Sequence, residues 1–313
     1  MRRDALSDFA ADVRAGLGGP GQKWLPARWL YDDLGSTLFE AITHLPEYGL
    51  TRADERVITR LAPEIATWLP GPLRIAEFGS GSGRKTAVLL RALMPRPVYH
   101  PIDVSTAALL MCSRELADVT TVVPEEGDYL AGLSRVLAQR SAGERLLLLF
   151  LGSTLGNFRP DDGLAFLRTV RSRLRAGDAL LLGADLIKDA RALILAYDDP
   201  TGVTAAFNRN LIGRINRELG ANFELGNYRH EARYERDAQR IEMHLRARCA
   251  AHVEIPGAGL GIDLVPGETI LTESSHKFTE RGLDRLAAEA DWLVACRWTD
   301  SAWPLAETLL VVP

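Results

Sequence analysis

Three glycines at alternate positions, with an acidic residue further along the chain, have the types and spacing best suited to chemistry. Gly79, Gly81 and Gly83 follow an apolar run, residues 73–78, and precede a periodic apolar segment. This order predicts a buried strand, a turn where the backbone can approach a ligand, and a helix whose N-terminus faces that ligand. Asp103 follows Gly79 by 24 residues and ends a second apolar segment. A turn that only packs a helix on a sheet would need no such acidic residue. An acidic side chain about 20 residues beyond the glycines usually accepts hydrogen bonds from the hydroxyl groups of a ribose, so the pattern favours a nucleoside-type cofactor.

The spacing of the loop narrows the choice of nucleoside. It is Gly-x-Gly-x-Gly rather than the Gly-x-Gly-x-x-Gly of dinucleotide enzymes, and a residue separates Gly83 from Lys85, unlike the Gly-Lys pair of a P-loop. The later strand ends at Gly152 without an acidic residue to hold Mg²⁺. Residues 77–83 instead resemble the first motif of Rossmann-like, S-adenosylmethionine-dependent methyltransferases, a class in which the position of Asp128 contacts adenine. The cofactor-binding residues that we expect on this basis are Glu77, Gly79, Gly81, Lys85, Asp103, Asp128, Tyr129 and Gly152.

Composition limits the class of protein and its partners. The chain has 313 residues, 47% hydrophobic and 25% charged, as in ordinary soluble globular proteins. A net charge of -4 argues against a nucleic-acid substrate, which requires a concentrated basic face. The three cysteines are scattered without a Cys-x-x-Cys pair, so we expect neither disulfides nor a zinc site. Acidic residues near the N-terminus and the lack of a long apolar run predict a cytoplasmic protein without a signal peptide or a membrane span. We also expect a monomer.

Alternating strands and helices must position the loop. Strands are expected near 73–78, 97–102, 120–123, 145–151 and 178–184, and helices near 84–94, 105–118, 129–140 and 161–175. Such alternation is typical of a parallel, doubly wound sheet, and the strand at 145–151 should be central because it is apolar on both faces. Two closing segments, 292–298 and 305–312, predict a final hairpin that completes the sheet. Before the sheet, Thr37 with Glu40 and Thr51 with Asp54 suggest capping boxes that start two helices.

A different pattern fills residues 188–276. Apolar residues occupy the odd positions from Ile241 to Ile255, which predicts one long antiparallel strand with a wet face. His244 and His252 would lie on that wet face among charges, and a metal site is not expected. We therefore predict an α/β protein of two parts. Residues 52–187 with 277–313 form the cofactor-binding sheet domain, and residues 1–51 with 188–276 form an α+β substrate-binding lobe over the carboxyl ends of the strands.

With these residues assigned, nearly the whole chain resembles one family, the L-histidine Nα-methyltransferases of ergothioneine biosynthesis. The segments that carry the resemblance are 29–39, 45–48 with 51–52, 150–158, 197–198, 240–244 and 273–278. The resemblance implies that the protein trimethylates the α-amino group of L-histidine to hercynine with three molecules of S-adenosylmethionine and no metal.

The resemblance also implies roles for individual residues. Asn157 and Tyr197 would hydrogen-bond the substrate carboxylate. Glu273 and Ser275, two apart in an extended segment, face the same way and would suit the two nitrogens of an imidazole ring. Tyr48 would hold the other side of the ring and Met243 would line its pocket. Tyr31 would lie near the amine, where an aromatic ring tolerates the growing quaternary ammonium.

The sequence departs from the family pattern at two glycines, and it leaves the route of the amine's proton open. Gly49 takes the place of a second aromatic residue, which would loosen the entry side of the substrate pocket, and Gly83 takes the place of a bulkier residue. No strong general base is evident, and the amine's proton would leave through Tyr31, Tyr48 or water.

Three rival hypotheses remain at the level of the sequence. The first is that the same fold acts on another amino acid such as tryptophan. Relatives of that kind are expected to lack an acidic residue at the position of Glu273, because an indole offers a single N–H donor. A non-catalytic protein that binds S-adenosylmethionine would not need Asn157, Tyr197, Glu273 and Ser275. A P-loop-like phosphotransferase would bind ATP with Mg²⁺.

Overall fold

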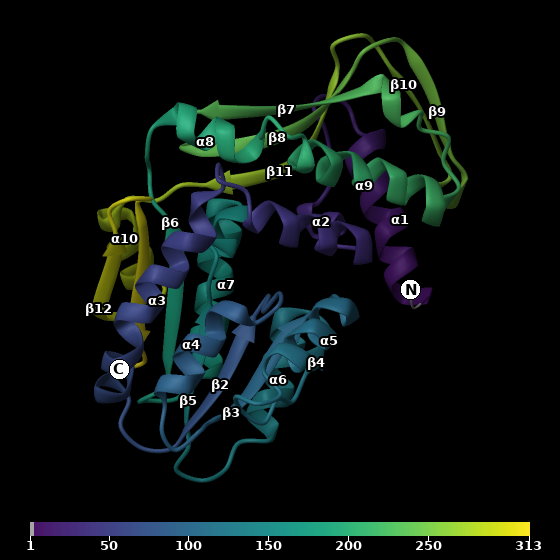
Figure 1. Ribbon diagram of the computed structural model, residues 1–313. Coiled ribbons are helices and arrows are strands. Elements are labelled where there is room, and N and C mark those ends of the chain that lie inside the picture. Colours follow the sequence, from purple (N-terminus) through teal and green to yellow (C-terminus); the bar gives the residue numbers. More distant parts are fainter. Residues whose placement is uncertain (1–2) are drawn as a thin grey trace. The chain divides into compact units, whose positions relative to one another are not determined.

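The computed structural model describes residues 3–313, and the chain divides into two compact units. The large unit comprises Gly49–Lys188 and His276–Pro313, and the small unit comprises the chain up to Tyr48 together with Asp189–Ser275. Figure 1 shows the elements of both. Met1 and Arg2, on which part of the signal-peptide prediction rests, lie outside the described residues. Within residues 3–313, no helix has both the length and the apolar character that a membrane span requires.

The large unit is built on a seven-stranded sheet. In chain order its strands are β2 (Leu73–Phe78), β3 (Val98–Asp103), β4 (Glu125–Glu126), β5 (Arg145–Phe150), β6 (Ala179–Asp185), β12 (Leu293–Asp300) and β13 (Leu305–Val311). Their spatial order is β12-β13-β6-β5-β2-β3-β4, with β5 in the centre as predicted. β13 runs antiparallel between β6 and β12, while the pairs from β6 to β4 are parallel. The doubly wound sheet and its C-terminal antiparallel hairpin are therefore confirmed.

Helices cover both faces of this sheet. They are α3 (Gly49–Trp68), α4 (Arg84–Ala92), α5 (Thr106–Glu115), α6 (Tyr129–Ala138), α7 (Pro160–Arg173) and α10 (Glu280–Glu289), with a short 3-10 turn, η2 (Thr154–Asn157). The apolar core that contains Phe78, Leu148 and Phe150 joins the sheet to α6, α7 and α10. α3, α4 and α5 pack on the opposite face. Glu77 points to this face, because it alternates with Phe78 along β2, and it accepts a hydrogen bond from the Tyr99 hydroxyl there.

The small unit combines short sheets with helices. Its four-stranded sheet has the order β1-β11-β8-β7, from β1 (Lys23–Trp24), β7 (Tyr228–Glu235), β8 (Arg240–Ala247) and β11 (Thr269–His276). A separate hairpin pairs β9 (Ala251–Ile255) with β10 (Leu260–Leu264). The remaining elements are α1 (Arg3–Gly18), α2 (Asp33–Thr43), α8 (Ala190–Tyr197), α9 (Val203–Leu219) and the 3-10 turns η1 (Ala27–Leu30), η3 (Leu225–Asn227) and η4 (Pro256–Ala258).

Several local predictions are wrong for physical reasons. α2 begins at Asp33 because Asp32, not Thr37, caps it by accepting a hydrogen bond from Gly35 N at 2.7 Å. α3 begins at Gly49, and Asp54 lies buried inside it, so Thr51 with Asp54 is no capping box. The strand expected at 120–123 is reduced to an isolated bridge, Tyr99 with Val122, and the pairing moves to β4.

The expected long strand at 241–255 is interrupted at residues 248–250 and becomes β8 and β9. His252 is exposed between Glu254 and Asp263, as predicted. The prediction is wrong for His244, which is 2% exposed and hydrogen-bonds through Nε2 to Glu242 Oε2 at 2.9 Å. β8 is an inner strand of its sheet, so long charged side chains on the same face shield His244 from water.

The chain leaves the large unit after Lys188 and returns at His276, and Asp185 binds both ends. Its carboxylate forms an ion pair with Lys188 and another with Lys277 Nζ at 3.1 Å, and it accepts a hydrogen bond from Trp303 Nε1 at 3.0 Å. Burial lowers the pKa of Lys188 to about 8, although Asp185 opposes the shift. One buried carboxylate therefore fixes both junctions of the inserted segment within the large unit.

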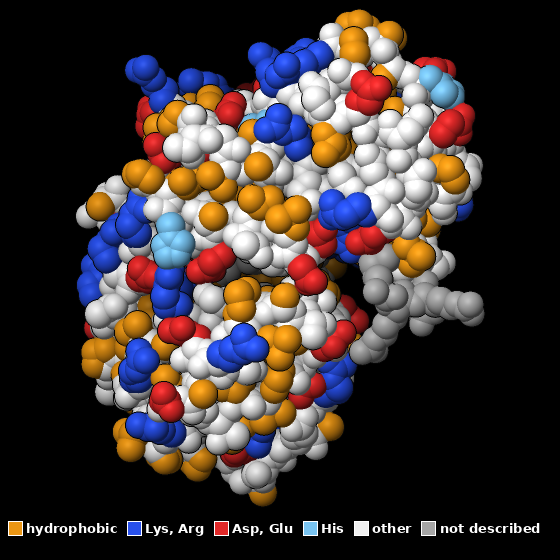
Figure 2. Space-filling view, turned by 45° about the vertical axis from the view of Figure 1, so that its right-hand side comes forward, with side chains coloured by type: hydrophobic (Ala, Val, Ile, Leu, Met, Phe, Trp, Pro, Cys, Tyr) orange, Lys and Arg blue, Asp and Glu red, His pale blue; other side chains and the backbone are white. Residues whose placement is uncertain are grey.

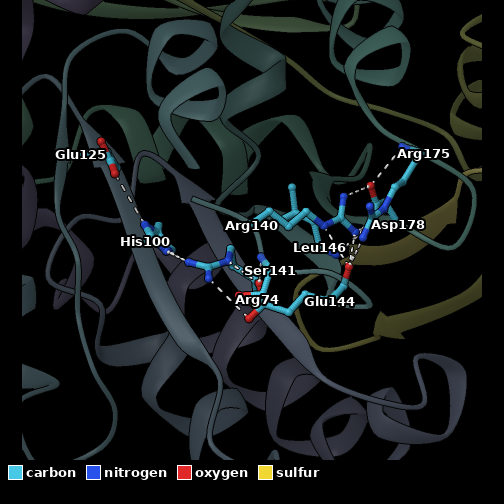
Figure 3. Close-up of polar contacts among 9 residues, drawn as sticks. All are labelled: Arg74, His100, Glu125, Arg140, Ser141, Glu144, Leu146, Arg175 and Asp178. Carbon is cyan, nitrogen blue, oxygen red and sulfur yellow. Dashed lines mark hydrogen bonds and ion pairs between the residues drawn. The ribbon is translucent and has the colours of Figure 1, made fainter. Parts of the chain in front are cut away.

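A second polar network links the amino ends of the strands (Figure 3). Arg74 on β2 contacts His100 on β3 at 2.6 Å and Glu144 at 3.0 Å. Asp178, which is fully buried, pairs with Arg140 and accepts hydrogen bonds from Leu146 N at 2.9 Å and Arg175 N at 3.0 Å. The network lies at the end of the sheet opposite to the glycine loop, so it stabilises the strands without entering the candidate site.

We expect Asp178→Ala to destabilise the protein by about 3–5 kcal/mol, because it leaves the buried guanidinium of Arg140 without its counter-charge. Asp284→Ala is the matched control, since it removes an ion pair with Arg297 whose aspartate side chain is 55% exposed, and should cost about 0.2–1 kcal/mol. Urea unfolding followed by circular dichroism would measure both. Equal losses in the two variants would contradict the importance assigned to the buried network.

Candidate functional site

The glycine loop joins the carboxyl end of β2 to the start of α4. Gly79, Gly81 and Gly83 all have positive φ, at 66°, 54° and 73°, where other residues are strained. A Cβ at Gly83 would lie 2.6 Å from Cys112 Sγ, so α5 leaves no room for a larger residue there. The positive φ and this contact together account for glycine at position 83.

Asp103 ends β3 beside the loop. Its carboxylate accepts hydrogen bonds from the backbone of Gly81 and from Ser105 N, the latter at 2.9 Å. Burial nevertheless raises the pKa of Asp103 above its usual value. The structure thus brings the loop and the acidic residue together, and a carboxylate there can accept hydrogen bonds from a pair of hydroxyl groups.

Asp128 and Tyr129 lie at the start of α6. Asp128 is the N-cap of this helix, accepting a hydrogen bond from Ala131 N at 2.9 Å, and its side chain is exposed. The Tyr129 ring packs 5.0 Å from Phe78, and its hydroxyl lies 3.1 Å from the position that a Cβ at Gly79 would take. Tyr129 therefore borders the glycine loop directly.

Buried charges lie on the α3 and α4 side of the loop. Glu77 is 1% exposed and accepts hydrogen bonds from Thr86 Oγ1 at 2.6 Å and Tyr99 hydroxyl at 2.5 Å. Burial raises the pKa of Glu77 to about 7. These bonds point the Glu77 carboxylate inward, so the side chain supports the loop from within the protein.

Lys85, on the first turn of α4, pairs with Asp54 Oδ2 at 2.5 Å. Its Nζ also lies 3.5 Å from the position that a Cβ at Gly152 would take, and Gly152 donates its N–H to Asp54. The Lys85 side chain remains 22% exposed. Lys85 and Gly152 thus meet at the carboxyl ends of β2 and β5, and Asp54 is a member of the cluster that the sequence reasoning missed.

Asn157 ends the η2 turn that follows β5. Ser153, at the start of the turn, has a φ of 58°, and its Oγ accepts a hydrogen bond from Asp185 N at 2.9 Å. A Cβ at Gly156 would lie 2.7 Å from His276 O, so the turn packs directly against the returning chain. The turn that carries Asn157 therefore packs against the junction around Asp185.

In the small unit, the three predicted tyrosines belong to one aromatic cluster. Tyr31 lies 5.5 Å, between ring centroids, from both Phe39 and Phe207. Tyr48 lies 6.2 Å from Phe39 and 6.4 Å from Tyr197. Phe39 on α2 and Phe207 on α9 connect the cluster, with ring centroids 5.9 Å apart. Neither was predicted as a site residue, because a phenylalanine on an amphipathic helix looks like an ordinary core residue.

Tyr197 is also held by a buried histidine. His230 Nε2 lies 2.7 Å from Tyr197 O, and its Nδ1 lies 2.8 Å from Asn208 Nδ2. Because the Asn208 amide donates to Nδ1, the Nε2–H tautomer satisfies both contacts. Burial lowers the pKa of His230, which favours the same neutral form.

Glu273, Ser275 and Met243 lie on adjacent strands of the small sheet. Glu273 is 9% exposed and Ser275 is 3% exposed, so neither side chain is a solvated surface group. Met243 is 1% exposed on β8, and its carbonyl accepts a hydrogen bond from Thr272 Oγ1 on β11 at 2.9 Å. A buried carboxylate beside a hydroxyl presents acceptors of the kind that a ring with polar nitrogens requires.

Charges of both signs are interspersed over the face of the protein shown in Figure 2. Within residues 3–313, no group of three or more His, Cys, Asp or Glu side chains is arranged to hold a metal ion.

Comparison with known proteins gives one consistent result. Residues 9–312 match the family model of histidine-specific, S-adenosylmethionine-dependent methyltransferases. The chain is 40% identical to the histidine N-alpha-methyltransferase of Mycolicibacterium smegmatis, over 98% of this chain and 96% of that protein. It is 28% identical to ergothioneine biosynthesis protein 1 of Schizosaccharomyces pombe, over 88% of this chain and 37% of that protein. It is also 27% identical to the L-tryptophan methyltransferase trpM of Psilocybe serbica, over 93% of this chain and 89% of that protein.

The structure also gives a testable account of Gly49. A Cβ there would lie 2.2 Å from Trp303 Cε3, so the indole already occupies the space that a side chain would take and leaves no loosened entry at this point. We expect Gly49→Ala to cost about 1–3 kcal/mol through overpacking, and to cost much less when Trp303→Leu is also present. A double-mutant cycle on unfolding free energies would measure the coupling. Additive effects would show that Trp303 does not restrict residue 49.

Proposed function

The chain belongs to the histidine-specific, S-adenosylmethionine-dependent methyltransferases, and we propose that it converts L-histidine to hercynine by methylating the α-amino group three times. This reaction would be the first step of ergothioneine biosynthesis. The observation that carries the proposal is the family match over residues 9–312, in a chain that also buries Glu273 and Ser275 side by side on β11. A cytoplasmic location and a monomeric state stay predictions from the sequence.

For the methyl donor, we assign a site at the carboxyl ends of β2, β3 and β5. Asp103 is the acceptor for the ribose hydroxyls, and Asp128 and Tyr129 flank the adenine. Lys85 and Gly152 meet at the other side of the glycine loop, so they are assigned to the methionine end. A lysine there suits the donor's carboxylate, the single anionic group that S-adenosylmethionine carries.

For histidine, we assign the imidazole ring to Glu273 and Ser275, with Tyr48 on its other side and Met243 lining its pocket. A carboxylate accepts a hydrogen bond from a ring N–H, and a hydroxyl adapts to the other nitrogen as donor or acceptor. Asn157 and Tyr197 are assigned to the substrate carboxylate. Tyr31 is assigned to the amine, where an aromatic ring stabilises the positive charge that develops on the nitrogen during each methyl transfer.

The chemistry requires little covalent help from the protein. The lone pair of a neutral α-amino nitrogen forms the new N–CH₃ bond while the S–CH₃ bond breaks, and the sulfonium leaves as S-adenosylhomocysteine. Holding the amine in line with the methyl can supply about 7–11 kcal/mol of the barrier. The protons of the amine leave through Tyr31, Tyr48 or water.

One experiment tests both the amino-acid substrate and whether the protein is an enzyme. The protein is incubated with S-adenosylmethionine and each of the twenty amino acids, and products are identified by mass spectrometry. We expect a gain of three methyl groups on histidine and S-adenosylhomocysteine formed only when histidine is present. Trimethylated tryptophan without methylated histidine would favour the tryptophan alternative, and binding without turnover would favour a non-catalytic protein. Calorimetry with ATP and Mg²⁺ tests the phosphotransferase alternative.

We predict that Asp103→Ala weakens S-adenosylmethionine binding by about tenfold or more, because each hydrogen bond to a carboxylate contributes roughly 1.5–3 kcal/mol. Calorimetric titration would measure the affinity, and an unchanged circular dichroism spectrum would show that the fold is intact. Unchanged affinity would remove the assignment of Asp103 to the ribose.

We predict that Glu273→Ala raises the KM for histidine about tenfold or more, since a desolvated ring nitrogen without its partner costs about 1–3 kcal/mol. Adding Met243→Val widens the pocket that Glu273→Ala has already made less polar, so a bulkier aromatic amino acid should gain relative to histidine. Steady-state kinetics with histidine and tryptophan would compare the variants. Unchanged histidine kinetics in the double variant would contradict the substrate assignment.

A further inference from the structure

The carboxylate that faces Lys85 has a carboxyl neighbour of its own. Asp54 lies on α3 and is fully buried, and Glu307 lies on β13 and is also fully buried. The two carboxyl groups are near enough to interact directly, and Asp54 Oδ1 and both carboxyl oxygens of Glu307 are buried without a hydrogen-bond donor among the residues described. Two carboxylates cannot share a hydrogen bond unless a proton lies between them, because both are otherwise acceptors.

The sheet provides space for this pair. Glu307 lies opposite Gly183 in the β13–β6 ladder, and a Cβ at Gly183 would come within 2.5 Å of Glu307 Oε1. Glycine at 183 therefore leaves the Glu307 carboxyl its space against the sheet. Burial raises the pKa of Glu307 well above its usual range, and the neighbouring Asp54 raises it further, which favours the protonated form of Glu307.

The charges that face the pair come from each element packed around it. Lys85 projects from α4, Glu77 from β2, Asp54 from α3 and Glu307 from β13. With the proton on Glu307, Asp54 supplies the single full counter-charge at hydrogen-bond distance from Lys85, through Oδ2 at 2.5 Å. The Glu77 carboxylate instead accepts hydrogen bonds from the hydroxyl groups of Thr86 and Tyr99.

A buried amine without a counter-ion loses its proton readily, because burial disfavours the charged form. Asp54 counters this effect and raises the pKa of Lys85 above its usual value. A second full negative charge at Glu307 would instead repel an incoming carboxylate. The arrangement thus keeps one positive charge ready at the cofactor loop without surrounding it with excess negative charge.

We propose that Asp54 and Glu307 share one proton and act together as the positioning counter-ion of Lys85, holding it charged and directed at the carboxylate of the methyl donor. This inference rests on the proposed function, because it takes S-adenosylmethionine as the ligand of Lys85. Neither Asp54 nor Glu307 touches the reacting atoms in this scheme.

The test compares two ligands that differ in the carboxylate. S-adenosylhomocysteine carries the amino-acid end, whereas 5′-methylthioadenosine has the same nucleoside and thioether without it. We expect Asp54→Asn to lower the binding affinity for S-adenosylhomocysteine about tenfold or more, and the affinity for 5′-methylthioadenosine less than about twofold. The loss relative to the unaltered protein should grow between about pH 7 and pH 9, because an unsupported Lys85 deprotonates as the pH rises. Taking the ratio to the unaltered protein at each pH cancels the titration of the ligand itself.

Glu307 is tested by a pair of substitutions. Glu307→Gln retains an N–H donor toward Asp54 and should bind S-adenosylhomocysteine several times more tightly than Glu307→Ala, which retains none. Arg56→Gln is the control for α3, because Arg56 lies on the same helix and pairs with Asp300 at 2.8 Å instead of with the cluster. It should lower the melting temperature without changing either affinity.

Three outcomes would overturn the inference. In the first, Asp54→Asn binds S-adenosylhomocysteine within about twofold of the unaltered protein at every pH. In the second, Asp54→Asn loses the same affinity for both ligands, and in the third, Glu307→Gln and Glu307→Ala lose the same affinity for S-adenosylhomocysteine. Failure of the unaltered protein to methylate histidine would contradict the proposed function alone, since these affinities are measured without the amino acid.

Discussion

Parallel pairing of β2 with β3 and β5 is the constraint on which the candidate cofactor site depends. The ladders pair Phe78 with Ile102 and Glu77 with Leu149, so three strands end at the same edge. Gly79, Asp103 and Gly152 follow those ends and are brought together although the chain separates them widely. A shift in the β2–β3 ladder would separate the loop from Asp103, and a shift in the β2–β5 ladder would separate it from Gly152. The chemistry of the large unit is therefore a property of strand register as much as of residue type.

The sequence predicted this part well because its signals are local. Apolar runs followed by glycine gave β2, β5 and the loop, and the antiparallel hairpin followed from two late apolar segments. Where the sequence failed, distant contacts decide the structure. Asp32 caps α2 but also accepts a hydrogen bond from Asn210 Nδ2 at 2.6 Å, and no pattern near Thr37 reveals that contact.

The buried polar groups show the same limit more sharply. Asp54 looks like the second half of a capping box and Glu307 like a charge in a closing strand, yet tertiary packing makes them neighbours. His244 looks solvated from the alternation around it, yet its position in an inner strand shields it. For the substrate residues, local chemistry alone gave little. Glu273 and Met243 became candidates through the family resemblance, and the structure adds that both are buried.

The place of β13 has a consequence for how the protein is made. The ribosome makes β6 long before β13, because the inserted segment, residues 189–275, comes between them. β13 then pairs along the full length of β6, from Leu305 with Asp185 to Val311 with Ala179. Until that happens β6, an apolar strand with an unpaired edge, is open to pairing with other chains. The nascent chain therefore carries this open apolar edge until residues 305–311 have been made, and termination of synthesis shortly before residue 305 would release a chain in which the edge stays open.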